Sequence, residues 1–185
     1  MTLSEKVAKP NIAMEPLLIV VMGVSGTGKS TLAHEFSRRY SFTYVDADSF
    51  HSEQSIEQMS KGIPLTNKQR LPWIKRISEQ LSLYRQQNIN CILAYSGLKK
   101  AHRDVIFSAY SNRIAVLLNA DEKLITERIN QRSDHFMPSK LLRNQLAEME
   151  PFNDEKPLLE LDIANSIDAL IKQMRGFIIE EGTNI

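Results

Sequence analysis

The glycine-rich stretch GVSGTGKST at residues 23–31 is the feature that most constrains what this chain can fold into. It satisfies the pattern G-x-x-x-x-G-K-[ST], in which backbone N–H groups curl around phosphate oxygens. Within it, Lys29 is expected to reach the β- and γ-phosphates, and the Ser30 hydroxyl is expected to take a place on Mg²⁺. The pattern therefore predicts a site for a nucleoside triphosphate.

The residues on either side place this loop between a strand and a helix. The run LLIVVM at residues 17–22 is continuously apolar, which is typical of a buried parallel strand. Beyond the loop, Leu32, Ala33 and Phe36 recur at helical spacing. This setting puts a helix N-terminus beneath the bound phosphates. We expect the nucleotide to be held by Gly23, Ser25, Gly26, Thr27, Gly28, Lys29, Ser30 and Thr31.

Length and composition indicate one soluble globular domain. The chain has 185 residues, of which 42% are hydrophobic and 24% charged. A net charge of +1 gives no general attraction to nucleic acid or to an anionic membrane. No apolar run approaches the roughly 18–20 residues needed to span a bilayer. We expect a disordered lead-in at residues 1–15 rather than a secretory signal, then one domain at residues 16–185, in a cytoplasmic protein.

Strand-like apolar runs alternate with helical patterns along the chain. The predicted strands are residues 17–22, 42–45, 91–95, 114–118 and 158–163. The predicted helices follow the glycine-rich loop and then cover a short segment ending near Met59 and residues 73–87, 99–109, 122–131, 140–149 and 166–179, with Pro72 in the first turn of the third. This alternation predicts a doubly wound α/β domain, with a five-stranded parallel sheet covered by helices on both faces. The lone Cys91 excludes a disulfide within the chain.

Two carboxylates, Asp46 and Asp48, follow the predicted second strand at its carboxyl end, where ligands gather in open α/β sheets. Phosphoryl transfer to a hydroxyl needs one carboxylate near Mg²⁺ and another that accepts the hydroxyl proton. The alternative is a solvated turn, because D-x-D is common after strands. Beside an intact phosphate loop we favour the functional interpretation.

Two pairs of cations show the i, i+4 spacing of one helix face. Lys99 and Arg103 follow the third strand and could bind an anionic substrate, or could lie on an exposed helix face. Arg128 and Arg132 precede an irregular segment, which is typical of a lid that carries arginines over the phosphates. The alternative for this second pair is a cationic complement to a helix C-terminus.

Other site classes find little support. The histidines His34, His51, His102 and His135 lack the spacing of zinc ligands. Residues 67–70, NKQR, begin like the guanine-binding N-K-x-D segment of a regulatory GTPase but lack the acid.

Taken together, these segments resemble the small bacterial-type gluconokinases, which are P-loop kinases related to shikimate and nucleoside monophosphate kinases. The resemblance runs from residue 17 to the final helix. Beyond the phosphate loop it rests on DADSFH at 46–51, MSKGIPL at 59–65, RLPW at 70–73, SGLKKAHRD at 96–104 and the spacing of Gln145, Glu150, Pro151, Asp154 and Glu155. One departure is TNKQ at residues 66–69, where the family usually carries an acidic cluster.

The resemblance implies a kinase that phosphorylates D-gluconate to 6-phosphogluconate with ATP and Mg²⁺. It also implies a lid at about residues 128–140 and a homodimer. By resemblance, catalysis belongs to Lys29, Asp48, Arg128 and Arg132, and the metal to Ser30 and Asp46. The sugar acid would meet Asp48, His51, Arg70, Lys99 and Arg103, and Asp162 would lie in the turn that cradles adenine.

Two other functions stay open at this point. A kinase of a related small hydroxy acid is one, although shikimate kinases carry a run of glycines where this chain has SGLK at residues 96–99. The other is a nucleotide-binding relative that has lost catalysis. Retention of Lys29, Ser30 and Asp48 argues against the second.

Overall fold

The computed structural model describes residues 15–131 and 140–183. Its centre is a five-stranded, all-parallel sheet in the order β2-β3-β1-β4-β5. The strands are β1 (Leu17–Met22), β2 (Thr43–Asp46), β3 (Cys91–Ala94), β4 (Asn112–Asn119) and β5 (Leu158–Asp162). The predicted fold class is confirmed.

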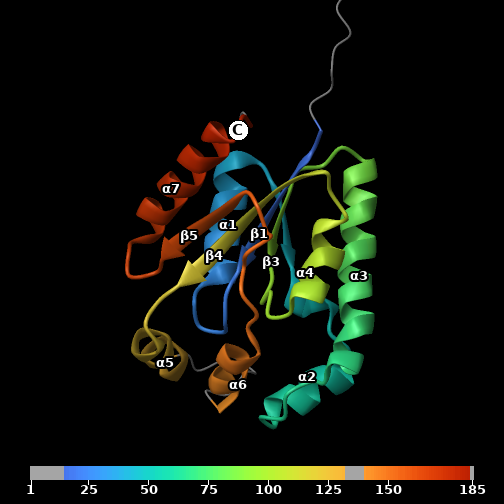
Figure 1. Cartoon of the computed structure of the whole chain (residues 1–185), viewed down its shortest axis with the longest axis vertical. Coiled ribbons are helices and arrows are strands. Elements are labelled where there is room, and N and C mark those ends of the chain that lie inside the picture. The colour runs from blue at the N-terminus through green and yellow to red at the C-terminus, as the bar shows by residue number, and fades with distance from the viewer. Residues whose placement is uncertain (1–14, 132–139, 184–185) are drawn as a thin grey trace, which may run out of the picture.

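Helices cover both faces of this sheet (Figure 1). They are α1 (Lys29–Tyr40), α2 (Glu53–Ser60), α3 (Asn67–Gln86), α4 (Lys100–Phe107), α5 (Glu122–Asn130), α6 (Lys140–Glu148) and α7 (Ile167–Glu180). A short 3₁₀ helix, Ala47–Phe50, follows β2. In Figure 1, α1 and α7 lie on one side of the sheet and α3 and α4 on the other, while α2, α5 and α6 gather beyond its carboxyl end.

The central strand β1 feeds both hydrophobic cores, because alternate side chains of a strand point to opposite faces. Leu17, Ile19 and Val21 belong to the core beneath α1 and α7. Leu18 and its alternate neighbours belong to the core beneath α3 and α4. All six residues of the strand are buried, so the phosphate loop that follows is attached to a rigid support.

The start of α3 differs from the predicted one. The helix begins at Asn67 rather than near Trp73, because Thr66 forms a capping box with Gln69. Pro72 therefore lies inside the helix and not in its first turn. The capping pair supplied a stronger start signal than the proline did.

The predicted terminal and lid segments are described only in part. Of the lead-in, Glu15 is described, and its carboxylate accepts a hydrogen bond from Ser111 Oγ at 2.6 Å. Most of the predicted lid, residues 132–139, lies outside the described residues. None of the helices in the described ranges is both long and apolar enough to cross a membrane.

Candidate active site

The phosphate loop adopts a conformation that depends on its glycines. Gly26 and Gly28 have φ angles of 86° and 90°, which side chains rarely tolerate. A Cβ on Gly26 would also lie 2.6 Å from Ile129 Cγ1 in α5. Lys29 Nζ donates to the carbonyl oxygen of Val24 at 2.9 Å, which holds the lysine across the loop. The loop is thus folded as the sequence motif requires.

The loop separates two cavities. The first cavity lies between the loop, the ends of β2 and β3, and helices α2, α3 and α6; residues that line it include Ser25, Lys29, Ser30, Asp46, Asp48, His51, Arg70, Trp73, Asn144, Gln145 and Glu148. The second cavity lies on the other side of the loop, towards α5 and the turn after β5; residues that line it include Gly26, Thr27, Thr31, Arg128, Gln131, Ile163 and Asn165. Groups bound in the two cavities would therefore approach each other at the phosphate loop.

The two carboxylates after β2 have different surroundings. Asp46 Oδ1 accepts the N–H of Asp48 at 3.0 Å, and its Oδ2 accepts the phenol O–H of Tyr44 at 3.0 Å. Burial, and then the charge of Asp46, raise the pKa of Tyr44, so the phenol stays protonated as a donor. Tyr44 also hydrogen-bonds Ser30. Asp46 is consequently tied to the phosphate loop, whereas the side chain of Asp48 is 45% exposed and lines the first cavity.

His51 is held as a neutral ring beside Asp48. Its imidazole stacks on Trp73, with ring centroids 4.2 Å apart, and its side chain is only 5% exposed. Burial first, and then the charges of Arg76 and Arg70, lower the pKa of His51 to about 4. Its Nε2 lies 4.0 Å from Asp48 Oδ1, which is a contact between a neutral ring and a carboxylate at neutral pH.

Helix α6 closes the first cavity and was not assigned a role from sequence. Gln145 Oε1 accepts the backbone N–H of Ser25 at 2.7 Å, across 120 residues of chain. Glu148 Oε2 lies 2.6 Å from Arg70 Nη1 in α3. Arg70 therefore lines the first cavity paired with a carboxylate, and its contact with the sugar acid stays a prediction. The Q-x-x-E spacing that joins these two acceptors on one helix face was the signal available in the sequence.

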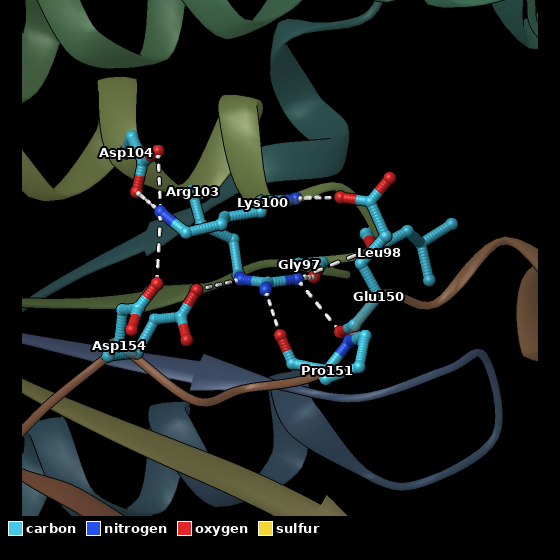
Figure 2. A network of polar contacts seen from close by, with 9 residues as sticks. Gly97, Leu98, Lys100, Arg103, Asp104, Glu150, Pro151 and Asp154 are labelled. Atoms are coloured by element: carbon cyan, nitrogen blue, oxygen red, sulfur yellow. Dashed lines mark hydrogen bonds and ion pairs between the residues drawn. The ribbon is translucent and has the colours of Figure 1, made fainter.

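Arg103, which is predicted to meet the sugar acid, contacts protein groups in this structure. The side chain is fully buried, its Nε pairs with the carboxylate of Glu155, and its Nη2 donates to Pro151 O at 2.6 Å. Its Nη1 donates to Gly97 O at 2.8 Å (Figure 2). These donors serve the protein and Arg103 does not line the first cavity, so its contact with the sugar acid stays a prediction.

Arg103 is the centre of a clamp between the loop after β3 and the segment after α6 (Figure 2). The Glu150 N–H donates to Leu98 O at 2.8 Å, and Lys100 N–H donates to Glu150 Oε2 at 2.6 Å. The Lys100 N–H, and then Lys99, hold the pKa of Glu150 below its ordinary value. Lys99 Nζ lies 3.3 Å from Glu150 Oε1, so this predicted substrate contact also serves the clamp and does not line the first cavity.

Some of the residues predicted to contact the nucleotide line the second cavity. Arg128 lines it and donates from Nη2 to Ile163 O at 2.8 Å. The turn after β5 reaches it through Ile163 and Asn165 rather than through Asp162. The exposed Asp162 carboxylate accepts the N–H of Ala164 at 2.9 Å, and its contact with adenine stays a prediction. Arg132 lies outside the described residues.

The oxygen donors around the first cavity fit a hard divalent cation. Ser30 and Asp46 both line it, and hydroxyl and carboxylate oxygens are ligands that Mg²⁺ prefers. Within residues 15–131 and 140–183, no three His, Cys, Asp or Glu side chains form a ready-made metal cage. Mg²⁺ commonly keeps several waters and takes its other ligands from substrate phosphates, so a small donor set is what it requires.

Comparisons with known proteins agree with this geometry. A family model described as an AAA domain matches residues 18–152. The thermosensitive gluconokinase of Escherichia coli (strain K12) is 33% identical over 162 residues, which are 86% of this chain and 86% of that protein. A probable gluconokinase of Dictyostelium discoideum is 33% identical over 174 residues, which are 89% of this chain and 87% of that protein.

Solved structures extend the likeness to three dimensions. A sugar kinase from Janibacter sp. HTCC2649 superimposes with a TM-score of 0.84 at 32% identity, covering 89% of this chain and 95% of that chain. A gluconokinase from Sinorhizobium meliloti 1021 superimposes with a TM-score of 0.76 at 30% identity, covering 91% of this chain and 99% of that chain.

Proposed function

Because this chain belongs to the gluconokinase family of P-loop kinases, we propose that it transfers the γ-phosphoryl group of ATP to the 6-hydroxyl of D-gluconate. The observation that carries the proposal is the first cavity, where Lys29 and Ser30 of the phosphate loop share one space with Asp48. Phosphate-binding groups and a carboxylate able to receive a hydroxyl proton therefore border the same space.

The reaction exchanges one P–O bond for another. The hydroxyl oxygen of the acceptor forms a bond to the γ-phosphorus, the bond from that phosphorus to the β,γ-bridging oxygen breaks, and ADP leaves. Asp48 takes the hydroxyl proton as the new bond forms, since its carboxylate lines the same cavity as the phosphate-binding groups.

Charge stabilisation comes from residues on both sides of the phosphate loop. Lys29 and the loop N–H groups neutralise the phosphates from below, and Arg128 contributes from the second cavity. Ser30 and Asp46 would hold Mg²⁺, which supplies further neutralisation of phosphate charge when bound. Phosphoryl transfer gains most from this kind of positioning and electrostatics.

A cation in the first cavity favours an acidic acceptor. Arg70 enters from α3 with its side chain only 12% exposed, where its charge is weakly screened. A carboxylate on a polyol can pair with this guanidinium while a terminal hydroxyl reaches Asp48. We further propose that the enzyme works in the cytoplasm and that, as the resemblance to its family implies, it forms a homodimer.

A coupled assay of ADP release tests the function. We expect kcat/KM for D-gluconate to exceed that for glucose, shikimate and nucleoside monophosphates. Lys29→Ala measured beside the wild type is the matched control, because it removes the phosphate contact and leaves the acceptor side intact. A kcat/KM for glucose equal to that for gluconate would contradict an acidic acceptor. A higher kcat/KM for shikimate would show that the enzyme is a kinase of a related hydroxy acid instead.

A further inference from the structure

Helix α6 contacts both the phosphate loop and the opposite side of the first cavity. We call the residues of that side the acceptor wall; they are Asp48, His51, Arg70 and Trp73. Gln145 and Glu148 are three positions apart, so they lie on one face of the helix. Gln145 accepts the Ser25 N–H at 2.7 Å, and Glu148 pairs with Arg70 at 2.6 Å. One rigid element thus joins the group that holds phosphate to the cation that faces the acceptor.

The contact at Ser25 is one that a bound nucleotide would disturb. Ser25 is buried within the phosphate loop, and its N–H is satisfied by an uncharged side-chain amide. Phosphate oxygens carry negative charge, and hydrogen bonds to charged acceptors are roughly twice as strong as neutral ones. Nucleotide binding in the loop therefore changes the electrostatics at the point where Gln145 is attached.

The contact at Arg70 is one that an acidic acceptor would disturb. Glu148 occupies the guanidinium with its own carboxylate, which is the group that the acceptor would also present. Arg70 is followed one turn later by Trp73, which stacks on His51 beside Asp48. A change in the Arg70–Glu148 pair therefore changes the positions of the acceptor-wall residues that orient the attacking hydroxyl.

The C-terminal end of α6 is anchored, so a displacement of the helix at Gln145 is not lost through movement of the segment that follows it. Glu150, two residues past the end of α6, is fixed by the Leu98 carbonyl and the Lys100 N–H, and Arg103 holds the segment that follows (Figure 2). With this end held, displacement of α6 at Gln145 is passed to Glu148, one turn closer to the anchor.

We propose that Gln145 and Glu148 are positioning residues that couple the phosphate loop to the acceptor wall through α6. Nucleotide in the loop changes the Gln145–Ser25 contact, α6 shifts, and the Glu148–Arg70 pair loosens so that Arg70 can receive the acceptor's carboxylate. The inference rests on the proposed function for the identity of that acceptor, but the link between loop and wall is independent of it.

The sole tryptophan of the chain is a built-in reporter for this link. Trp73 lines the first cavity, three residues beyond Arg70. The experiment follows its fluorescence while a non-hydrolysable ATP analogue with Mg²⁺ is added without any acceptor, and calorimetry measures analogue binding in parallel. We expect the wild type to show a saturable change in emission with the affinity measured by calorimetry.

Variants separate coupling from simple stability. Gln145→Leu and Glu148→Gln should bind the analogue but lose most of the Trp73 response, because each breaks one end of the link. Gln145→Glu keeps an acceptor for Ser25 but adds a negative charge beside the phosphates, so the Kd for the analogue should rise about tenfold or more. Arg143→Gln is the matched control, because Arg143 lies on α6 with its side chain 88% exposed and outside the first cavity.

The outcomes are distinct from those of the function test. A full Trp73 response in Gln145→Leu, or no response in the wild type, would overturn the coupling. If Gln145→Leu fails to fold by circular dichroism, Glu148→Gln carries the same test. Because no acceptor is present, failure to phosphorylate gluconate would overturn the proposed function and leave this result standing.

Discussion

At the scale of single residues, Asp46 and Asp48 carry the same chemical group but differ in what their carboxylates contact. Asp46 is held by the Asp48 N–H and by Tyr44, while Asp48 lines the first cavity. Asp48→Asn should therefore lower kcat by roughly 10²–10⁴-fold, the range for loss of a general base, and leave nucleotide affinity nearly unchanged. Single-turnover phosphorylation and calorimetry measure the two effects.

The matched variant is Asp46→Asn, which should weaken Mg²⁺-dependent nucleotide binding because Asp46 is tied to Ser30 through Tyr44. Near-normal turnover by Asp48→Asn would remove Asp48 from proton transfer. Loss of nucleotide binding in the same variant would instead move Asp48 to the metal.

Also at this scale, His51 makes the stability of the folded protein depend on pH. Its pKa falls from the ordinary 6.5 to about 4 on folding. Between these two pH values His51 is protonated in the unfolded chain and neutral in the folded chain. The contribution of His51 to stability is complete above about pH 6.5 and is lost as the pH falls towards 4. His51→Phe keeps a ring against Trp73 but cannot titrate. Thermal melts from pH 7.5 to 4.5 (about three units) should show a steeper loss of Tm in the wild type than in this variant; parallel curves would contradict the assignment.

At the scale of elements, the Arg103 clamp holds the segment after α6 by a buried ion pair, which differs from the exposed pairs on the helices. The Arg103 and Glu155 side chains are 0% and 3% exposed, whereas those of Lys61 and Glu57 are 62% and 66% exposed. Arg103→Met leaves Glu155 buried without its partner and should lower the free energy of unfolding by about 3–5 kcal/mol. Lys61→Met is the control, with a much smaller loss, because water screens an exposed ion pair. Urea denaturation measures both.

A third variant separates the ion pair from packing around the arginine. Arg103→Met combined with Glu155→Gln should recover part of the lost stability, because a neutral amide is less costly to bury than an unpaired carboxylate. A loss in Arg103→Met no larger than that in Lys61→Met would show that the buried pair adds nothing.

At the scale of the whole molecule, the sheet and the phosphate loop could be predicted from the sequence, because local residue patterns determine both. Apolar runs and a glycine-rich turn need no distant partner to be interpreted. The burial of Arg103 could not be predicted, because i, i+4 spacing defines a helix face but not whether that face meets solvent or another segment. Gln145 was missed because its partner, Ser25, is 120 residues away. In the turn after β5, the local pattern did not show that Ile163 and Asn165 would be the residues that line the second cavity.

The central position of β1 also bears on the order in which the chain can acquire structure during synthesis. β1 is made first among the strands, yet its two hydrogen-bonded neighbours are β3 and β4. A growing chain that ends before Cys91 contains neither of them, so the apolar run of β1 has no strand to pair with until then. Contacts this distant in sequence form slowly and leave apolar surface open to aggregation in the meantime. The phosphate loop at residues 23–31 therefore follows a strand that gains its neighbours only after residues 91–117 have been made.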